Sequence, residues 1–305
     1  MWEAAILPEP EHATGPFLEP LRLALRRLLS RLPVPIAEFL LFGLKQAWSC
    51  LFGGVMLSAL IATKFLWSAD WPVHRYDFLF AFALTVQVLM LAFRLENLSE
   101  LKVIAVYHVV GTAMEIFKVH MGSWSYPEPA VMAISGVPLF SGFMYGSVGS
   151  YMARAIRVFD MRFTNFPGRN WTFALSVAIY ANFFGHHFIQ DFRWFLFAAT
   201  VVLYGRVRIY FTVDKTPRWM PLVVAALLTC FFMWVAENVG TFTGTWLYPG
   251  QADWRLVSLG KMGSWYLLLF VSFTLVTLVL PPRPPDDEPV TEDDEVIQTN
   301  RLTSQ

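Results

Sequence analysis

The sequence predicts an all-α, polytopic membrane helix bundle with about eight transmembrane helices, arranged as two parallel four-helix repeats. Three observations lead to this prediction. Hydrophobic residues make up 56% of the 305 residues and charged residues only 15%, whereas soluble domains carry about 25% charged residues. Apolar stretches long enough to cross a bilayer recur along the chain, and one group of polar and aromatic residues occurs twice at a fixed spacing.

Eight apolar stretches match the length needed to cross a hydrocarbon core of roughly 30 Å, which takes about 20 helical residues. They lie at residues 46–67, 77–94, 99–119, 131–153, 171–188, 194–211, 220–240 and 257–280. The second and sixth are short and close to their neighbours, so each is expected either to span the membrane or to be tilted or re-entrant.

Lysine and arginine residues are unevenly distributed over the segments between these stretches. When the segments are assigned alternately to the two sides, 17 of the 23 basic residues fall on the side that holds both chain ends. Because basic residues accumulate on the cytoplasmic side of membranes, we predict a multi-pass protein of the bacterial inner membrane with both termini in the cytoplasm.

The same reading divides the chain into four regions. Residues 1–35 form an N-terminal cytoplasmic segment with an amphipathic helix, which lies either on anionic lipid head groups or on the cytoplasmic face of the bundle. Residues 36–157 and 158–280 form the first and second membrane halves. Residues 281–305 are rich in proline and acidic residues, which predicts a disordered cytoplasmic tail.

The repeated group consists of a Glu followed after seven, nine, eleven and twelve residues by a Gly, a Trp, a Tyr and a Pro. Its members are Glu115, Gly122, Trp124, Tyr126 and Pro127 in the first copy and Glu237, Gly244, Trp246, Tyr248 and Pro249 in the second. The copies end the third and seventh stretches, four helices apart, so both halves cross the membrane in the same direction. This predicts a polar site between the halves. Alternatively, the Trp and Tyr residues only anchor helix ends at the membrane interface.

Ionisable residues inside apolar stretches are candidates for chemistry, because a charged group within a membrane is costly. Glu237 has no basic residue one turn away, whereas Glu115 has Lys118, so an ion pair between these two is the alternative reading. We predict that the catalytic residues are Glu237, Glu115, His108 and His186. The predicted substrate-binding residues are Trp124, Tyr126, Trp246, Tyr248, Asn182, Asn238 and Lys118.

No metal or cofactor is predicted. His108, His186 and Glu115 would suffice as three metal ligands, but no HxxxH or HExxH spacing supports such a site. Walker loops, dinucleotide fingerprints and nucleic-acid modules are also absent from the sequence. The expected partners are therefore membrane lipids and a lipid-soluble or small-molecule substrate, with no nucleic acid, and the oligomeric state stays open.

Two segments, GTAMEIFKVHMGSWSYPEP and ENVGTFTGTWLYPG, resemble the signature segments of a bacterial membrane-protein family known as domain of unknown function 817. The resemblance covers residues 36–280 and implies a membrane fold and location without a particular reaction. Glu115, Gly122, Tyr126 and the GVPL segment at 136–139 are more weakly similar to carotenoid hydratases and lycopene cyclases, which would imply acid chemistry on an isoprenoid. The second half departs from that pattern, with LGKM at 259–262.

Together these features predict a cofactor-independent membrane enzyme that performs acid/base chemistry on a lipid-soluble or isoprenoid substrate. Hydration, cyclisation and isomerisation are the reactions such groups would serve. A proton-coupled transporter or channel for a small solute is the first alternative, because intramembrane carboxylates also carry protons in transport. A structural membrane assembly factor is the second.

Overall fold

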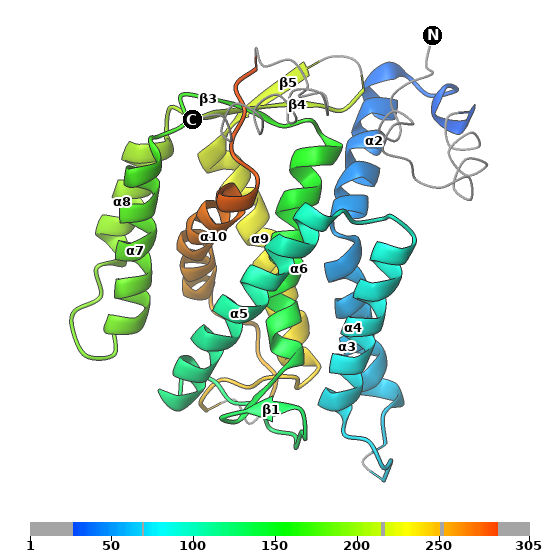
Figure 1. Cartoon of the computed structure of the whole chain (residues 1–305), viewed down its shortest axis with the longest axis vertical. Coiled ribbons are helices and arrows are strands. Elements are labelled where there is room, and N and C mark those ends of the chain that lie inside the picture. Colours follow the sequence, from blue (N-terminus) through cyan, green and yellow to red (C-terminus); the bar gives the residue numbers. More distant parts are fainter. Residues whose placement is uncertain (1–26, 69, 215–216, 251–252, 286–305) are drawn as a thin grey trace, which may run out of the picture.

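The structure is a computed structural model that describes residues 27–68, 70–214, 217–250 and 253–285. The described chain is mostly helical, with short strands at both ends of a helix bundle (Figure 1). The helices are α2 (Val34–Ser49), α3 (Leu51–Leu66), α4 (Arg75–Ala92), α5 (Leu98–His120), α6 (Phe140–Val158), α7 (Arg169–Gly185), α8 (Arg193–Tyr204), α9 (Leu222–Phe242) and α10 (Leu259–Val279). The strands are β1 (Ala133–Ile134), β2 (Val137–Pro138), β3 (Arg162–Thr164), β4 (Arg208–Thr212) and β5 (Pro217–Pro221). Most of the predicted amphipathic helix in residues 1–35 and most of the predicted tail at 281–305 lie outside the described residues.

Four of the described helices are long and apolar enough to cross a membrane, namely α4, α5, α9 and α10. Helices α2 and α3 pass the same test only as a pair, bent by 71°, so the number rises to five if this pair forms one span. These helices are consistent with a membrane protein. The count of eight spans and the two-repeat layout stay predictions.

Three of the predicted stretches are not continuous helices: the first, 46–67, contains the bend between α2 and α3, and in the sixth and fourth the all-α class needs correction because strands interrupt them. Helix α8 has 12 residues, after which the chain continues as β4. At 1.5 Å per residue this helix is about 18 Å long, short of the roughly 30 Å needed. The fourth stretch begins as the β1–β2 hairpin, and α6 starts only at Phe140. In both places the backbone N–H and C=O groups form hydrogen bonds between antiparallel strands rather than within a helix.

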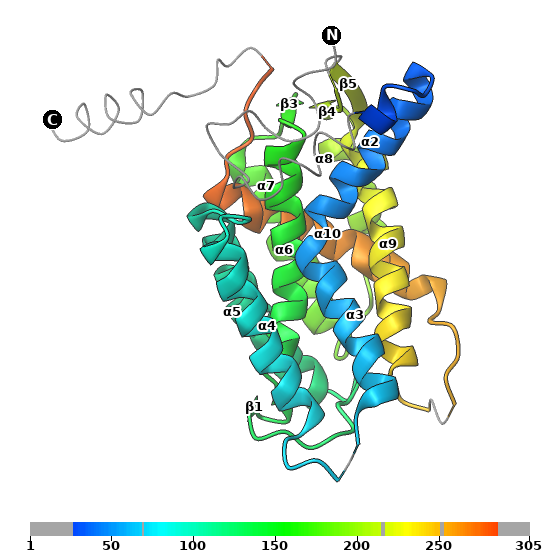
Figure 2. The ribbon, with the colours of Figure 1, turned by 90° about the vertical axis from the view of Figure 1, so that its right-hand side faces the viewer.

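The three-stranded sheet closes one end of the bundle. Strands β3, β4 and β5 are antiparallel neighbours, with Arg162 opposite Tyr210 and Arg208 opposite Pro221. The segment after α10 joins this end, since Phe163 N–H donates to Arg283 O at 2.8 Å. The segments that follow α5 and α9 lie at the opposite end with β1, as Figures 1 and 2 show.

Helix α6 occupies the centre of the bundle and contacts α2, α3, α4, α5 and α10. Its approach to α5 is close because Gly142 has no side chain. A Cβ atom at Gly142 would lie 2.4 Å from His108 Nδ1 and 2.6 Å from Thr112 Oγ1. Small residues of this kind let membrane helices pack backbone to backbone, and here they bring α6 against the helix that carries Glu115.

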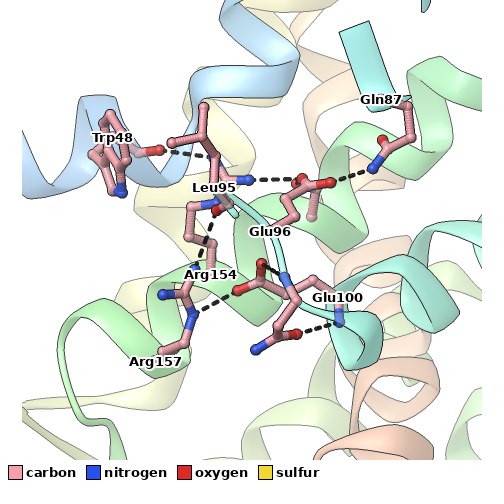
Figure 3. Close-up of polar contacts among 9 residues, drawn as sticks. Trp48, Gln87, Leu95, Glu96, Glu100, Arg154 and Arg157 are labelled. Carbon is pink, nitrogen blue, oxygen red and sulfur yellow. Dashed lines mark hydrogen bonds and ion pairs between the residues drawn. The ribbon is translucent and has the colours of Figure 1, made fainter. Parts of the chain in front are cut away.

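A buried ion-pair network attaches the turn between α4 and α5 to α6, near the sheet end (Figure 3). Arg154 Nη2 donates to Glu96 Oε1 at 2.7 Å, and both side chains are 0% exposed. Gln87 also donates to Glu96. Arg157 Nε donates to Glu100 Oε1 at 2.8 Å. Since a buried charge is costly without a partner, these pairs fix the position of the start of α5.

Candidate functional site

The two repeated glutamates share one cavity. Glu115 lies on α5 and Glu237 on α9, each five residues before the last residue of its helix. Only 3% of Glu115 and 5% of Glu237 is exposed. Both line a cavity of about 350 Å³, and both helices end at the face of the bundle away from the sheet (Figure 1). The structure therefore brings together two carboxylates that are distant in sequence.

Glu115 accepts three hydrogen bonds from neutral aromatic side chains. Trp124 Nε1 donates to its Oε2 at 2.7 Å, and the Tyr126 hydroxyl donates to the same oxygen at 3.0 Å. The Tyr145 hydroxyl, which belongs to α6, donates to Oε1 at 2.6 Å. A carboxylate offers about four acceptor positions, so most of the hydrogen-bonding capacity of Glu115 is in use.

Glu237 is held in a similar way, through one of its two oxygens. Trp246 Nε1 donates to Glu237 Oε1 at 2.9 Å, and the Tyr248 hydroxyl donates to the same oxygen. Trp265 of α10 lines the cavity close to Glu237. In each copy of the repeated group, the Glu is therefore bound by the Trp nine residues later and the Tyr eleven residues later. This fixed local geometry accounts for the spacing found in the sequence.

The two WxYP segments, residues 124–127 and 246–249, also bind each other. Ser125 N–H donates to Leu247 O, and Leu247 N–H donates to Ser125 O, both at 2.9 Å. The rings of Trp124 and Tyr248 meet edge to face with their centroids 6.3 Å apart. This reciprocal pairing holds the two segments together. Such pairing would not be needed if each segment only anchored its own helix at the membrane interface.

One glycine is needed for this geometry. A Cβ atom at Gly240 would lie 2.0 Å from Cη2 of Trp246, so the indole ring occupies the space that a side chain there would fill. Gly240 is the position in the second copy that corresponds to Lys118 in the first, and the two residues have different roles. Gly240 makes room for the donor that binds Glu237, whereas Lys118 faces another part of the cavity.

The ion pair between Glu115 and Lys118, which was the alternative to a catalytic Glu115, is not formed. Lys118 Nζ donates to Phe183 O at 2.6 Å and lies 3.1 Å from Nε2 of His187. Lys118 is only 2% exposed and lines the cavity. His186 also lines the cavity, with Nδ1 3.2 Å from Asn182 O, and its ring is tilted by 33° to that of His187 with the ring centroids 4.2 Å apart.

Of the two predicted asparagines, Asn182 lines the cavity and Asn238 does not. Asn182 Nδ2 donates to Asp191 Oδ1 at 3.0 Å and Asn182 Oδ1 accepts from Phe192 N–H at 2.7 Å, which fixes the turn between α7 and α8. Asn182 lines the cavity. Asn238 is absent from the cavity wall, because its amide group accepts from Val257 N–H at 2.8 Å and anchors the segment before α10.

His108, a predicted catalytic residue, is not among the side chains that line this cavity. Its ring lies 4.7 Å from that of Phe143 at the contact between α5 and α6. Its Nδ1 is buried and has no hydrogen-bond partner within the described part of the chain. Sequence periodicity placed His108 on the same helix face as Glu115, but the close approach of α6 separates the two along that face.

Sequence reasoning missed three residues that complete the site, namely Tyr145, Trp265 and Lys261. Lys261 Nζ lies 3.9 Å from the centre of the Tyr248 ring and 5.7 Å from that of Trp124. These residues come from α6 and α10, outside the repeated group. Their only signal in the sequence is a polar or amphipathic side chain within an apolar stretch.

The described residues hold no group of three or more His, Cys, Asp or Glu side chains placed to bind one metal ion. The site instead combines two hydrogen-bonded carboxylates with aromatic walls and nearby cationic groups. Such an arrangement can bind an amphipathic molecule and exchange protons with it.

Comparison with known proteins confirms the predicted family resemblance. Residues 38–273 match the protein family described as "Protein of unknown function (DUF817)". The chain is 44% identical to "Uncharacterized protein YoaT" of Bacillus subtilis (strain 168) over 242 residues, which cover 79% of this chain and 91% of that relative. No solved structure matches the chain. The weaker similarity to carotenoid hydratases and lycopene cyclases is not shown by these comparisons.

Proposed function

This chain belongs to the DUF817 family, and we propose that it is a membrane enzyme that performs acid/base chemistry on a lipid-soluble substrate. The observation that carries the proposal is the pair of buried carboxylates, Glu115 and Glu237, facing one cavity between helices that are long enough to cross a membrane. An ionisable group in such a position is costly and by default marks a functional site.

The hydrogen bonds to the carboxylates support a part for them in proton transfer. The indole and phenol groups that contact Glu115 and Glu237 donate hydrogen bonds to them. Donors of this kind stabilise the ionised form of a carboxylate. We therefore assign the abstraction of a substrate proton to one group in its ionised form, and the delivery of a proton at another position to the second group, which starts the turnover as the carboxylic acid and ends it as the carboxylate. Hydration, cyclisation and isomerisation all require such a transfer.

The proposal includes the membrane arrangement. We place the chain in the bacterial inner membrane with both termini in the cytoplasm and with eight spans in two parallel repeats. The excess of basic residues on one side supports this orientation. The matching hydrogen bonds of Glu115 and Glu237, together with the reciprocal bonds between Ser125 and Leu247, support a symmetric relation of the halves.

The test compares total lipid extracts, by mass spectrometry, from a strain that lacks the gene and carries the wild-type chain, Glu237→Gln or Glu115→Gln. The amide keeps the shape of the carboxylate but cannot take up a proton. We expect a product that differs from its precursor by water or by isomerisation, present with the wild type and absent with either variant. Glu38→Gln, on α2 outside the cavity, is the matched control and should restore the product.

Two results would refute the enzyme. Restoration of the product by both Glu237→Gln and Glu115→Gln would show that neither carboxylate exchanges protons. Identical extracts with and without the gene would instead favour a role for the two carboxylates in proton-coupled transport. Flux measurements in proteoliposomes at several pH values would then test that role.

A further inference from the structure

The cavity has a second set of charged groups, which the proposed acid/base chemistry does not use. Lys118, Lys261 and Arg193 all line it, and they lie close enough to repel one another. Each comes from a different helix and lies near the end of that helix: Lys118 two residues before the end of α5, Arg193 at the start of α8 and Lys261 two residues after the start of α10.

Lys118 is a buried cation without an ion-pair partner among the described residues. The residue is 2% exposed, and its ammonium group contacts Phe183 O and His187 Nε2. The described residues provide no carboxylate in an ion pair with it. An ammonium group has three donors, and a buried cation without an anion is strongly unfavourable. Lys118 is therefore a group that a ligand anion would complete.

Lys261, the second lysine of the cavity, lies against aromatic rings. Its ammonium group lies over the ring of Tyr248 at 3.9 Å, a cation–π contact, and forms no ion pair or hydrogen bond among the residues described. Arg193 is different, because Asp191 Oδ2 lies 2.6 Å from its Nε. Asp191 forms an ion pair with Arg193, whereas Lys118 and Lys261 form none among the described residues. Asp191 attracts Lys118 and Glu237 attracts Lys261 only from beyond ion-pair distance.

The carboxylates do not fill this need. Glu115 accepts three hydrogen bonds, from Trp124, Tyr126 and Tyr145, and Trp246 and Tyr248 both donate to one oxygen of Glu237. Neutral donors therefore occupy both oxygens of Glu115 and Oε1 of Glu237, and neither carboxylate forms an ion pair with Lys118 or Lys261. The two lysines thus keep donors and positive charge that an anionic group of a ligand can use.

From this geometry we infer that the ligand of the cavity is an amphiphile with an oxyanion head group, bound by Lys118 and Lys261 with Arg193 beside them. The inference rests on the proposed function and names its substrate class. The lysines lie nearer the helix ends than Glu115 and Glu237, so the head group sits at the membrane interface and the apolar body extends along Tyr145 and Trp265. That position brings the body, rather than the head group, to the carboxylates.

The test measures binding to the full chain in phosphatidylcholine nanodiscs. The probe is ω-bromoundecyl phosphate, whose bromine atom quenches tryptophan fluorescence, and three tryptophans line the cavity, Trp124, Trp246 and Trp265. ω-Bromoundecanol has the same chain without the anion, and inorganic phosphate has the anion without the chain. We expect saturable quenching by the phosphate ester, none that saturates with the alcohol, and weak competition by inorganic phosphate.

Three variants locate the site. Lys118→Met and Lys261→Met keep the length of the side chain and remove the charge, so each should weaken binding of the ester by about tenfold or more. Lys64→Met, on exposed Lys64 of α3, is the matched control and should bind like the wild type. Should Lys118→Met fail to fold, Lys261→Met, at a half-buried position, decides the question alone.

The possible outcomes separate this inference from the proposed function. Equal binding of the ester and the alcohol, or unchanged binding by Lys261→Met, would overturn the oxyanion site. If inorganic phosphate competes as strongly as the ester, the inference that the ligand is an amphiphile is overturned. A normal lipid profile with Glu237→Gln would overturn the acid/base function, whereas the binding measurements on the lysine variants decide the oxyanion site independently.

Discussion

Removal of Glu96 should destabilise the fold more than the loss of any exposed charge. Arg154 is 0% exposed, and its Nη2 lies 2.7 Å from Glu96 Oε1. Its other hydrogen bond goes from Nη1 to Trp48 O at 3.3 Å, and its Nε has no partner among the described residues. Glu96→Gln would therefore leave a buried guanidinium group without an anion. Breaking one side of such a pair costs about 3–5 kcal/mol.

The double variant Glu96→Gln/Arg154→Met provides the decisive comparison. It removes both charges and leaves an apolar side chain of similar length, so it should recover more than half of the loss, in line with buried ion pairs replaced elsewhere. The free energy of unfolding would be measured for the purified chain by SDS titration in mixed micelles, with helical circular dichroism as the signal.

Glu38→Gln is the control for this cycle. Glu38 pairs with Arg218 at 2.7 Å, but 54% of the Arg218 side chain is exposed. Exposed ion pairs contribute little to stability, so this variant should unfold close to the wild type. A loss below about 1 kcal/mol for Glu96→Gln, or a double variant no more stable than either single one, would refute the assignment of the network as a buried, charge-dependent attachment of α5 to α6.

Three further predictions concern the site and the helix that carries it. Gly240→Val should displace the Trp246 ring, whose Cη2 lies 2.0 Å from an added Cβ, and abolish product formation in the lipid extract; a normal product level would contradict the close contact. Asn97→Ala removes the side chain that caps α5 and should cost about 1 kcal/mol in the SDS titration; an unchanged midpoint would show that the cap is dispensable. Burial and the nearby charge of Lys118 lower the pKa of His187, so Lys118→Met should raise that pKa in an NMR titration, and a pKa that stays in place would exclude the contact.

Local patterns predicted much of this site because its central contacts are local. The Trp and Tyr that bind each Glu follow it by nine and eleven residues, a distance that one helix end and one turn bridge without help from the rest of the fold. The turns are alike, with Gly122 and Gly244 at φ values of +67° and +66°, a conformation that favours glycine. Spacing alone was therefore enough to identify the group.

Other parts of the site depend on how helices pack. Tyr145 reaches Glu115 from α6, and Lys261 reaches Tyr248 from the start of α10. Helical periodicity shows which residues share a face of one helix, but it says nothing about which face of a second helix lies opposite. For the same reason the position of His108 could not be predicted: it shares a helix face with Glu115 but contacts Phe143 away from the cavity.

The sequence by itself determined the membrane character, the family and the repeated group in which each Glu is followed by a Trp and a Tyr, because composition, apolar length and local spacing carry that information. It predicted the Trp and Tyr residues as substrate-binding, whereas in the structure their polar groups donate to the carboxylates. The tertiary structure alone decided that both carboxylates face one cavity, that Ser125 and Leu247 join the two WxYP segments, and that Lys118 turns to His187 instead of Glu115. These are contacts between segments up to 122 residues apart. These contacts depend on how each helix is rotated and how closely the helices pack, and a local pattern of residues contains neither kind of information.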